Sequence, residues 1–170
     1  MSRFFVLYLP DRSWQAYLDV MRLVCEPDAQ SPAHITVRGP YVGKSDPLGD
    51  WRKVKNIDVS VVGLGTFFAE RQNTVFLECD SPQLPEIWWK KDHKNGTPHL
   101  TIYDGGSREF ATRVFDVLGK YSWRFNFVAD RLHEYVSTGP QMRLDLRWAT
   151  TVSLCARCLA SGLRGSSCAG

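Results

Sequence analysis

The chain has 170 residues, 44% of them hydrophobic and 23% charged, which is the composition of an ordinary globular domain with a substantial core. Its formal net charge of +3 permits an anionic ligand but lacks the dense basic stripe typical of a long nucleic-acid track. No hydrophobic run is long enough to span a bilayer, and the N-terminus lacks the pattern of a signal peptide. We therefore expect a cytoplasmic monomer that does not bind membranes.

The first forty residues predict a strand, a helix and a second strand. Residues 4–9 form a continuous hydrophobic run closed by a proline, which is typical of a buried strand. Asp11 can cap the helix that follows. A polar loop leads into a strand over residues 34–38, which Gly39 and Pro40 should end. The helix has hydrophobic residues at spacings of three and four: Trp14, Tyr17, Leu18, Met21 and Val24.

The middle of the chain predicts a hairpin that follows a long polar loop. Residues 57–68 indicate a long strand, in which Gly63 and Gly65 mark a bulge or bend. A short turn leads into another strand over residues 74–79. A short helix over residues 82–91 should follow, and then a polar turn.

The remaining chain predicts three further strands and one helix. A strand over residues 99–103 should end at a glycine-rich break, after which Ser107 can cap a helix. Residues 123–136 indicate another strand, and residues 142–148 alternate as an edge strand would. The tail, residues 149–170, is rich in Ala, Ser, Gly and Cys and should be weakly ordered. The hydrophobic stripe of the helix comprises Phe110, Val114, Val117 and Leu118.

One short motif occurs twice, as His34-Ile35-Thr36-Val37 and as His99-Leu100-Thr101-Ile102. Side chains at i and i+2 of a strand point to the same face, so each histidine should share a face with its threonine. The intervening hydrophobic residues should then enter the core. A strand histidine is more often structural than catalytic, and one copy alone would be weak evidence. Two copies with similar flanking elements indicate an internal duplication.

The duplication predicts an α+β fold of two lobes. Residues 1–148 should form a single bilobal domain, with lobes over roughly residues 1–70 and 71–148 that exchange strands. Two antiparallel sheets related by a pseudo-twofold axis would line a central groove, with the helices outside. The two motif strands would face each other across that groove.

Two histidines facing each other suit displacement at phosphorus, because one imidazole can accept a proton while the other donates one. The threonine hydroxyls, those of Thr36 and Thr101, can donate hydrogen bonds to phosphate oxygens. If the strands stay regular, Arg38 and Tyr103 share the groove face at i+4 from the histidines. Arg38 would then bind phosphate and Tyr103 would contact a base, with Tyr41 as an aromatic residue at the rim.

Other chemistry-bearing residues show no matching pattern. His93 and His133 have no repeated partner, and we interpret them as surface residues. Cys155 and Cys158 form a lone Cys-x-x-Cys without a second ligand pair, so incidental tail cysteines are favoured over a zinc or redox site. No carboxylate cluster accompanies the motif histidines, and we expect no metal or other cofactor.

The paired motifs resemble those of the 2H phosphoesterase superfamily, which includes 2′-5′ RNA ligase-like proteins and cyclic nucleotide phosphodiesterases. The similarity covers roughly residues 3–137 and includes the strands before each motif. The stretch after the first motif, residues 38–41, differs from the RNA ligase-like branch. The resemblance implies a metal-independent phosphodiesterase that acts on a nucleotide 2′,3′-cyclic phosphate or on a 2′-5′ or cyclic oligonucleotide. The alternative is a non-catalytic module that sequesters RNA ends or cyclic nucleotides.

Overall fold

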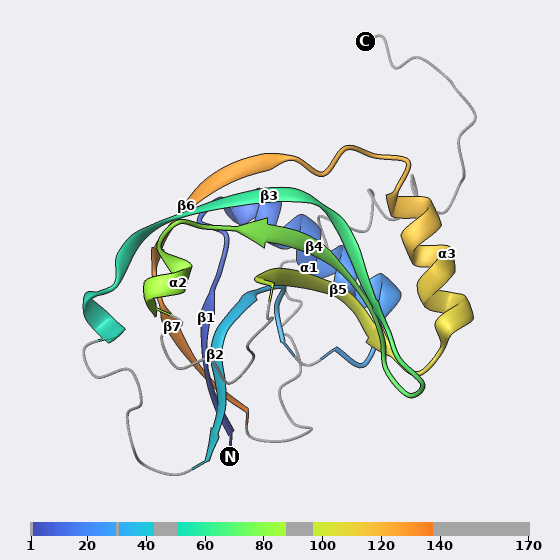
Figure 1. Cartoon of the computed structure of the whole chain (residues 1–170), viewed down its shortest axis with the longest axis horizontal. Coiled ribbons are helices and arrows are strands. Elements are labelled where there is room, and N and C mark those ends of the chain that lie inside the picture. The colour runs from blue at the N-terminus through green and yellow to red at the C-terminus, as the bar shows by residue number, and fades with distance from the viewer. Residues whose placement is uncertain (1, 30, 43–50, 88–96, 138–170) are drawn as a thin grey trace, which may run out of the picture.

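The computed structural model describes residues 2–29, 31–42, 51–87 and 97–137, which form a mixed α+β fold around one curled antiparallel sheet (Figure 1). The strand order is β6-β3-β4-β5-β2-β1-β7. The strands are β1 (Ser2–Leu7), β2 (Ile35–Val42), β3 (Lys55–Phe68), β4 (Asn73–Asp80), β5 (His99–Gly105), β6 (Phe125–Arg131) and β7 (His133–Ser137). The helices are α1 (Arg12–Cys25), α2 (Leu84–Ile87) and α3 (Arg108–Leu118), with a 3₁₀ turn at Trp51–Lys53.

The two edges of the sheet meet at Leu132. Strands β6 and β7 follow each other in the chain with only this buried residue between them, yet they lie at opposite ends of the strand order. Six inter-strand steps of a flat sheet would span ~29 Å, whereas one residue spans ~3.5 Å. The sheet must therefore curl, as Figure 1 shows. The single strand predicted over residues 123–136 is wrong, because the chain changes sheet edge at Leu132.

The two motif strands share the shortest strand pairing in the sheet, which we call the β2–β5 joint. Strands β2 and β5 pair antiparallel at one position, Ile35 with Leu100. The strands expected to form two sheets are thus joined into one, with β6-β3-β4-β5 on one side of this joint and β2-β1-β7 on the other. The mixed α+β class is confirmed.

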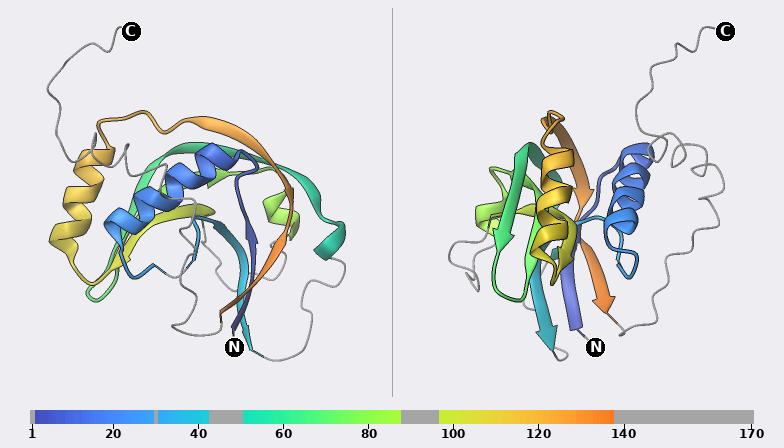
Figure 2. Two further views of the ribbon diagram at one scale, coloured as in Figure 1. Left: turned by 180° about the vertical axis from the view of Figure 1, so that it is seen from behind. Right: turned by 90° about the vertical axis from the view of Figure 1, so that its right-hand side faces the viewer.

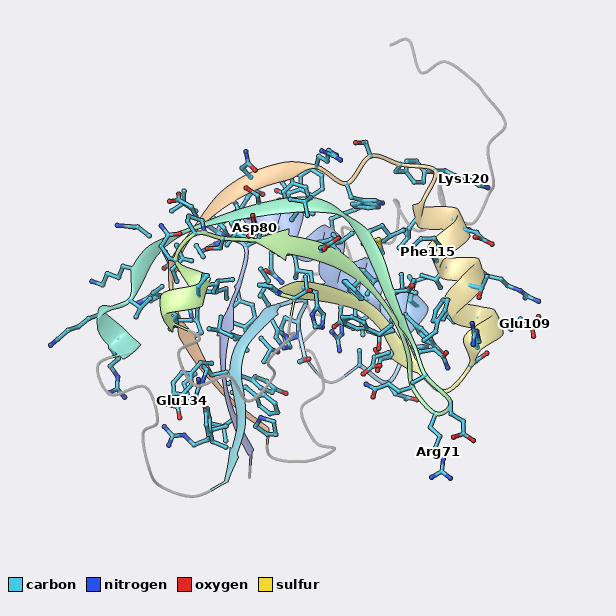
Figure 3. All side chains as sticks on the ribbon, in the orientation of Figure 1. Arg71, Asp80, Glu109, Phe115, Lys120 and Glu134 are labelled. Carbon is cyan, nitrogen blue, oxygen red and sulfur yellow. The ribbon has the colours of Figure 1, made fainter. Side chains whose placement is uncertain are left out.

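A bulged strand replaces the predicted break after the first motif. Strand β2 continues through Gly39 and Pro40 to pair Tyr41 with Arg3. Gly39 adopts a φ of +123°, and an added Cβ would lie 2.7 Å from the carbonyl oxygen of Arg3. Only glycine tolerates that backbone at that approach, so the residue expected to end the strand instead lets it continue. On the other side of β1, Arg3 forms an ion pair with Glu134 of the edge strand β7. Figure 3 marks the position of Glu134.

Both main helices begin as predicted but bury only part of each predicted stripe. Asp11 accepts hydrogen bonds from the backbone of Ser13 and Trp14, and the Ser107 hydroxyl accepts one from Phe110. Helix α1 packs against β5, and α3 against β3, β4 and β5 (Figure 2). The predicted stripe residues Trp14, Tyr17, Val24, Phe110 and Val117 are exposed. The packed positions of α1 include Leu18, Met21 and Cys25, and those of α3 include Ala111, Val114, Phe115 and Leu118.

The predicted edge strand over residues 142–148 and the tail lie outside the described residues. Within the described part of the chain, no helix has the length and hydrophobicity needed to cross a membrane.

Candidate active site

The two motif histidines are held by the same local contact. His34 lies just before β2, and its Nδ1 is 2.7 Å from the carbonyl oxygen of Pro32. His99 begins β5, and its Nδ1 is 2.7 Å from the carbonyl oxygen of Thr97. A carbonyl oxygen can only accept, so Nδ1 carries the hydrogen in both rings. Each histidine therefore keeps Nε2 for acid–base chemistry.

The β2–β5 joint brings the two motifs together. With Ile35 opposite Leu100 in an antiparallel pair, the register sets His34 opposite Thr101 and sets Thr36 opposite His99. Ile35 and Leu100 are fully buried on the core face, and alternation places their neighbours on the other face. We call these four neighbours the motif quartet: His34, Thr36, His99 and Thr101.

His34 is a neutral imidazole at physiological pH. Burial lowers its pKa to about 4, and the nearby charges of Arg22 and His99 act in the same direction. The hydrogen bond to Pro32 acts against this lowering. A neutral ring whose Nδ1 is already a donor has an Nε2 that can accept a proton.

Tyrosine rings surround His34. Tyr135 of β7 stacks on the imidazole at a centroid distance of 6.1 Å, and Tyr8 meets its edge at 6.3 Å. Burial, and secondarily the proximity of Tyr135, raises the pKa of Tyr8 to about 12. Its hydroxyl thus keeps its proton and remains a hydrogen-bond donor near His34. Sequence reasoning missed both tyrosines, because their only signal was a place in hydrophobic strands.

Phenylalanine rings surround His99. Phe76 lies 4.9 Å from the imidazole centroid, Phe67 lies 5.5 Å from it, and the two phenylalanines stack at 4.3 Å. The Phe76 ring covers Gly65, where an added Cβ would lie 2.6 Å from a ring carbon. The predicted bulge of β3 occurs near Gly63, so the role of Gly65 is to leave room for this ring.

A β-bulge follows each motif threonine. The register advances by two residues on β2, from Thr36 to Arg38, while β1 advances by one. It does the same on β5, from Thr101 to Tyr103, while β4 advances by one. The extra residues are Val37 and Ile102, at the same place in each motif.

The bulges overturn the predicted placement of Arg38 and Tyr103. Because each bulge inserts one residue, the next side chain pairs with a core residue, which is Phe5 for Arg38 and Val75 for Tyr103. Arg38 is buried, and its Nε donates to the Tyr41 hydroxyl. The two predicted substrate-binding residues do not share the face of the quartet.

Tyr103 and Tyr41 contribute to packing. The Tyr103 ring packs edge-on against Phe110 of α3 at 5.1 Å, on the core side of β5. Tyr41 is half-buried against the core, with its ring 6.2 Å from that of Phe5. Tyr41 therefore does not line the rim of a groove as predicted. Its ring packs beneath Arg38, whose guanidinium carbon lies 5.6 Å from the ring centroid.

Helix α1 holds the first motif in place through polar side chains. Gln15 Nε2 donates to the carbonyl oxygen of Ala33 at 2.8 Å, and the Ala33 amide donates to Asp19 Oδ1 at 2.6 Å. The backbone carbonyl and amide of Ala33, the residue before His34, are thus both hydrogen-bonded to side chains of α1. Arg22, one turn further, donates to the carbonyl oxygen of Thr101 at 3.3 Å. Polar residues inside a packed helix face are the signal that sequence reasoning overlooked.

The other predicted residues have mixed outcomes. His133 is half-buried rather than on the surface, with its ring 5.1 Å from that of Tyr8. His93, Cys155 and Cys158 lie outside the described residues. Within the ranges that the structure describes, no group of three or more His, Cys, Asp or Glu side chains is arranged to hold a metal ion. Burial raises the pKa of the Cys79 thiol to about 12, so this thiol is protonated.

The assignment of this site rests on its residues and geometry alone. No protein-family model matches the chain, and no curated protein matches it.

Proposed function

We propose that this protein is a 2H phosphoesterase: a metal-independent hydrolase of a nucleotide 2′,3′-cyclic phosphate or of a 2′-5′ or cyclic oligonucleotide phosphodiester. The observation that carries the proposal is the meeting of the two motifs at the Ile35–Leu100 pair. That pair places two histidines and two threonines on one face, with each histidine oriented by the same Nδ1 contact. Short motifs match by chance, but matched positions in three dimensions rarely do.

The duplicated bilobal fold is part of the same proposal. Three observations support it: the equivalent histidine contacts, the equivalent bulges at Val37 and Ile102, and an exchange of strands. Strand β3 follows the first motif but pairs with β4, while β7 follows the second motif but pairs with β1. A duplicated strand-helix-strand unit with swapped final strands accounts for all three.

In the proposed reaction His34 is the general base and His99 the general acid. Neutral His34 accepts a proton from the attacking water at Nε2, and the water oxygen forms a bond to phosphorus. One ester bond of the phosphodiester breaks, and Nε2 of His99 donates a proton to the leaving oxygen. The hydroxyls of Thr36 and Thr101 donate to the non-bridging oxygens, whose charge they stabilise.

A substrate panel tests the proposal. Purified protein is incubated, with EDTA present, with nucleoside 2′,3′-cyclic phosphates, 2′-5′ oligoadenylate, and cyclic di- and trinucleotides. We expect turnover of at least one class, unaffected by EDTA. No turnover of any of them, or activity that EDTA abolishes, contradicts the metal-independent hydrolase. Tight binding without product would favour the alternative of a sequestering module.

A further inference from the structure

A pocket lies away from the motif quartet, between the start of α1 and the segment before β6. Its volume is about 490 Å³, within the range of ~300–1,000 Å³ typical of small-ligand sites. No residue of the quartet or of its aromatic surroundings contributes to it. The described residues that line it are Ser13, Trp14, Tyr17, Tyr121, Ser122, Trp123, Arg124 and Phe125.

Exposed aromatic rings form the walls of this pocket. Trp14 stacks on Phe125 at a centroid distance of 5.2 Å with an interplanar angle of 18°, and Tyr17 meets Trp14 edge-on at 5.8 Å. Trp14, Tyr17 and Tyr121 are 46%, 44% and 58% exposed. Trp123 is buried behind them and donates from Nε1 to the Leu118 carbonyl oxygen. Large rings gathered in the open are a feature of binding surfaces.

The charge of the pocket favours an anion. Arg124 is exposed, and the eight described lining residues include no carboxylate. The neighbouring Asp11 is occupied in capping α1, with Oδ1 accepting from the backbone of Ser13 and Trp14. A second cation, Lys120, extends from the turn after α3, directly before Tyr121 in the chain (Figure 3). Planar faces beside a guanidinium match the base and phosphate of a nucleotide.

We propose that this pocket binds one nucleotide of a single-stranded RNA segment, with the base stacked on the exposed rings and the phosphate bound by Arg124. Stacking on aromatic side chains beside a basic group is how proteins hold single strands with little regard to sequence. The choice of RNA rests on the proposed function, because a 2′,3′-cyclic phosphate or a 2′-5′ linkage requires the ribose 2′-oxygen that RNA has and DNA lacks. The pocket would hold a part of the chain distant from the reacting phosphate.

Fluorescence anisotropy of the full chain with labelled oligouridylate tests the stacking. The oligomer has about eight nucleotides, within the usual site size of single-strand binders, and a blocked 3′ end that cannot form a cyclic phosphate. Tyr121→Ala should weaken binding by ~5- to 150-fold, whereas Tyr121→Phe, which keeps the ring, should bind as the wild type does. An abasic oligomer of the same length should compete poorly. Wild-type protein that does not bind, or equal binding by Tyr121→Ala, overturns the proposal.

The salt dependence of binding tests the phosphate contact. Arg124→Gln should reduce the slope of log affinity against log salt by about one contact. Arg113→Gln is the matched control, because it removes an exposed arginine on α3 that lies outside the pocket lining. Equal effects of the two substitutions would show non-specific attraction and contradict the proposal. Ultraviolet crosslinking of wild-type protein, mapped by mass spectrometry to the peptides of Trp14 and Tyr121, gives a test that needs no variant.

The two proposals fail separately. His34→Ala and His99→Ala should leave binding of the blocked oligomer unchanged while they lower kcat by ~10²–10⁴. Binding that disappears with these variants would place the oligomer at the motif quartet and overturn the pocket. If wild-type protein turns over a substrate of the panel but does not bind the blocked oligomer, the phosphodiesterase proposal is supported and the RNA-binding role of this pocket is excluded.

Discussion

At the scale of single residues, the two motif histidines have the same backbone contact but different surroundings. His34 lies among Tyr8, Tyr135 and the charge of Arg22, whereas His99 lies against Phe67 and Phe76. Burial lowers the pKa of His34 and so favours the neutral ring that a general base needs. The asymmetry thus supports assigning the base to His34.

Removal of either histidine should affect the chemical step far more than the fold. His34→Ala and His99→Ala should each lower kcat by ~10²–10⁴, the range for losing a positioned acid or base. The double variant should be much less than multiplicatively worse, because the pair acts as a unit. His133→Ala, a histidine outside the quartet, is the control and should keep most activity. Near-full activity of folded His99→Ala on the true substrate would exclude the two-histidine mechanism.

The buried neutral state of His34 should make stability depend on pH. Its folded pKa of about 4 lies below the reference value of 6.5, so the unfolded state binds more protons between these pH values. Stability should therefore fall as pH drops from 6.5 to about 4 and then level off, by at most roughly 3 kcal/mol. His34→Gln should flatten this window in urea unfolding measured at several pH values. An unchanged pH dependence in that variant would assign it to other groups.

At the scale of elements, the two glycines of β3 have different roles that a matched pair of substitutions can separate. Gly65→Ala places a Cβ 2.6 Å from a Phe76 ring carbon, whereas a Cβ at Gly63 meets nothing within 4 Å. Gly65→Ala should displace the ring that packs on His99, cost ~1–3 kcal/mol and lower kcat. Gly63→Ala should have none of these three effects. Urea unfolding and initial rates measure both, and equal behaviour of the two variants would contradict the packing role of Phe76.

At the scale of the whole molecule, the two sheet edges meet through a single buried residue. Leu132→Ala should destabilise the protein by ~2–5 kcal/mol, as expected for a leucine buried in a packed core. Val128→Ala, on the exposed side of β6, should change stability little. Both should unfold in one transition if the curled sheet is one cooperative unit. Separate transitions for the two sides of the β2–β5 joint would show that they fold independently.

The sequence by itself determined the local features of this protein. Strand alternation places each motif histidine on the same face as its threonine, and the caps at Asp11 and Ser107 begin both helices as predicted. These features depend on neighbours within a few residues, where residue type and spacing act directly. The repetition of the motif is also visible in the sequence alone.

Only the tertiary structure decided what surrounds the motifs. Val37 and Ile102 are ordinary strand residues, yet their bulges turn Arg38 and Tyr103 toward the core. A bulge depends on how two strands align, and that alignment is set by partners far away in the chain. The change of edge at Leu132 and the aromatic rings around each histidine have the same origin. They arise because curling one sheet brings distant strands together, and no local spacing records which strands will meet.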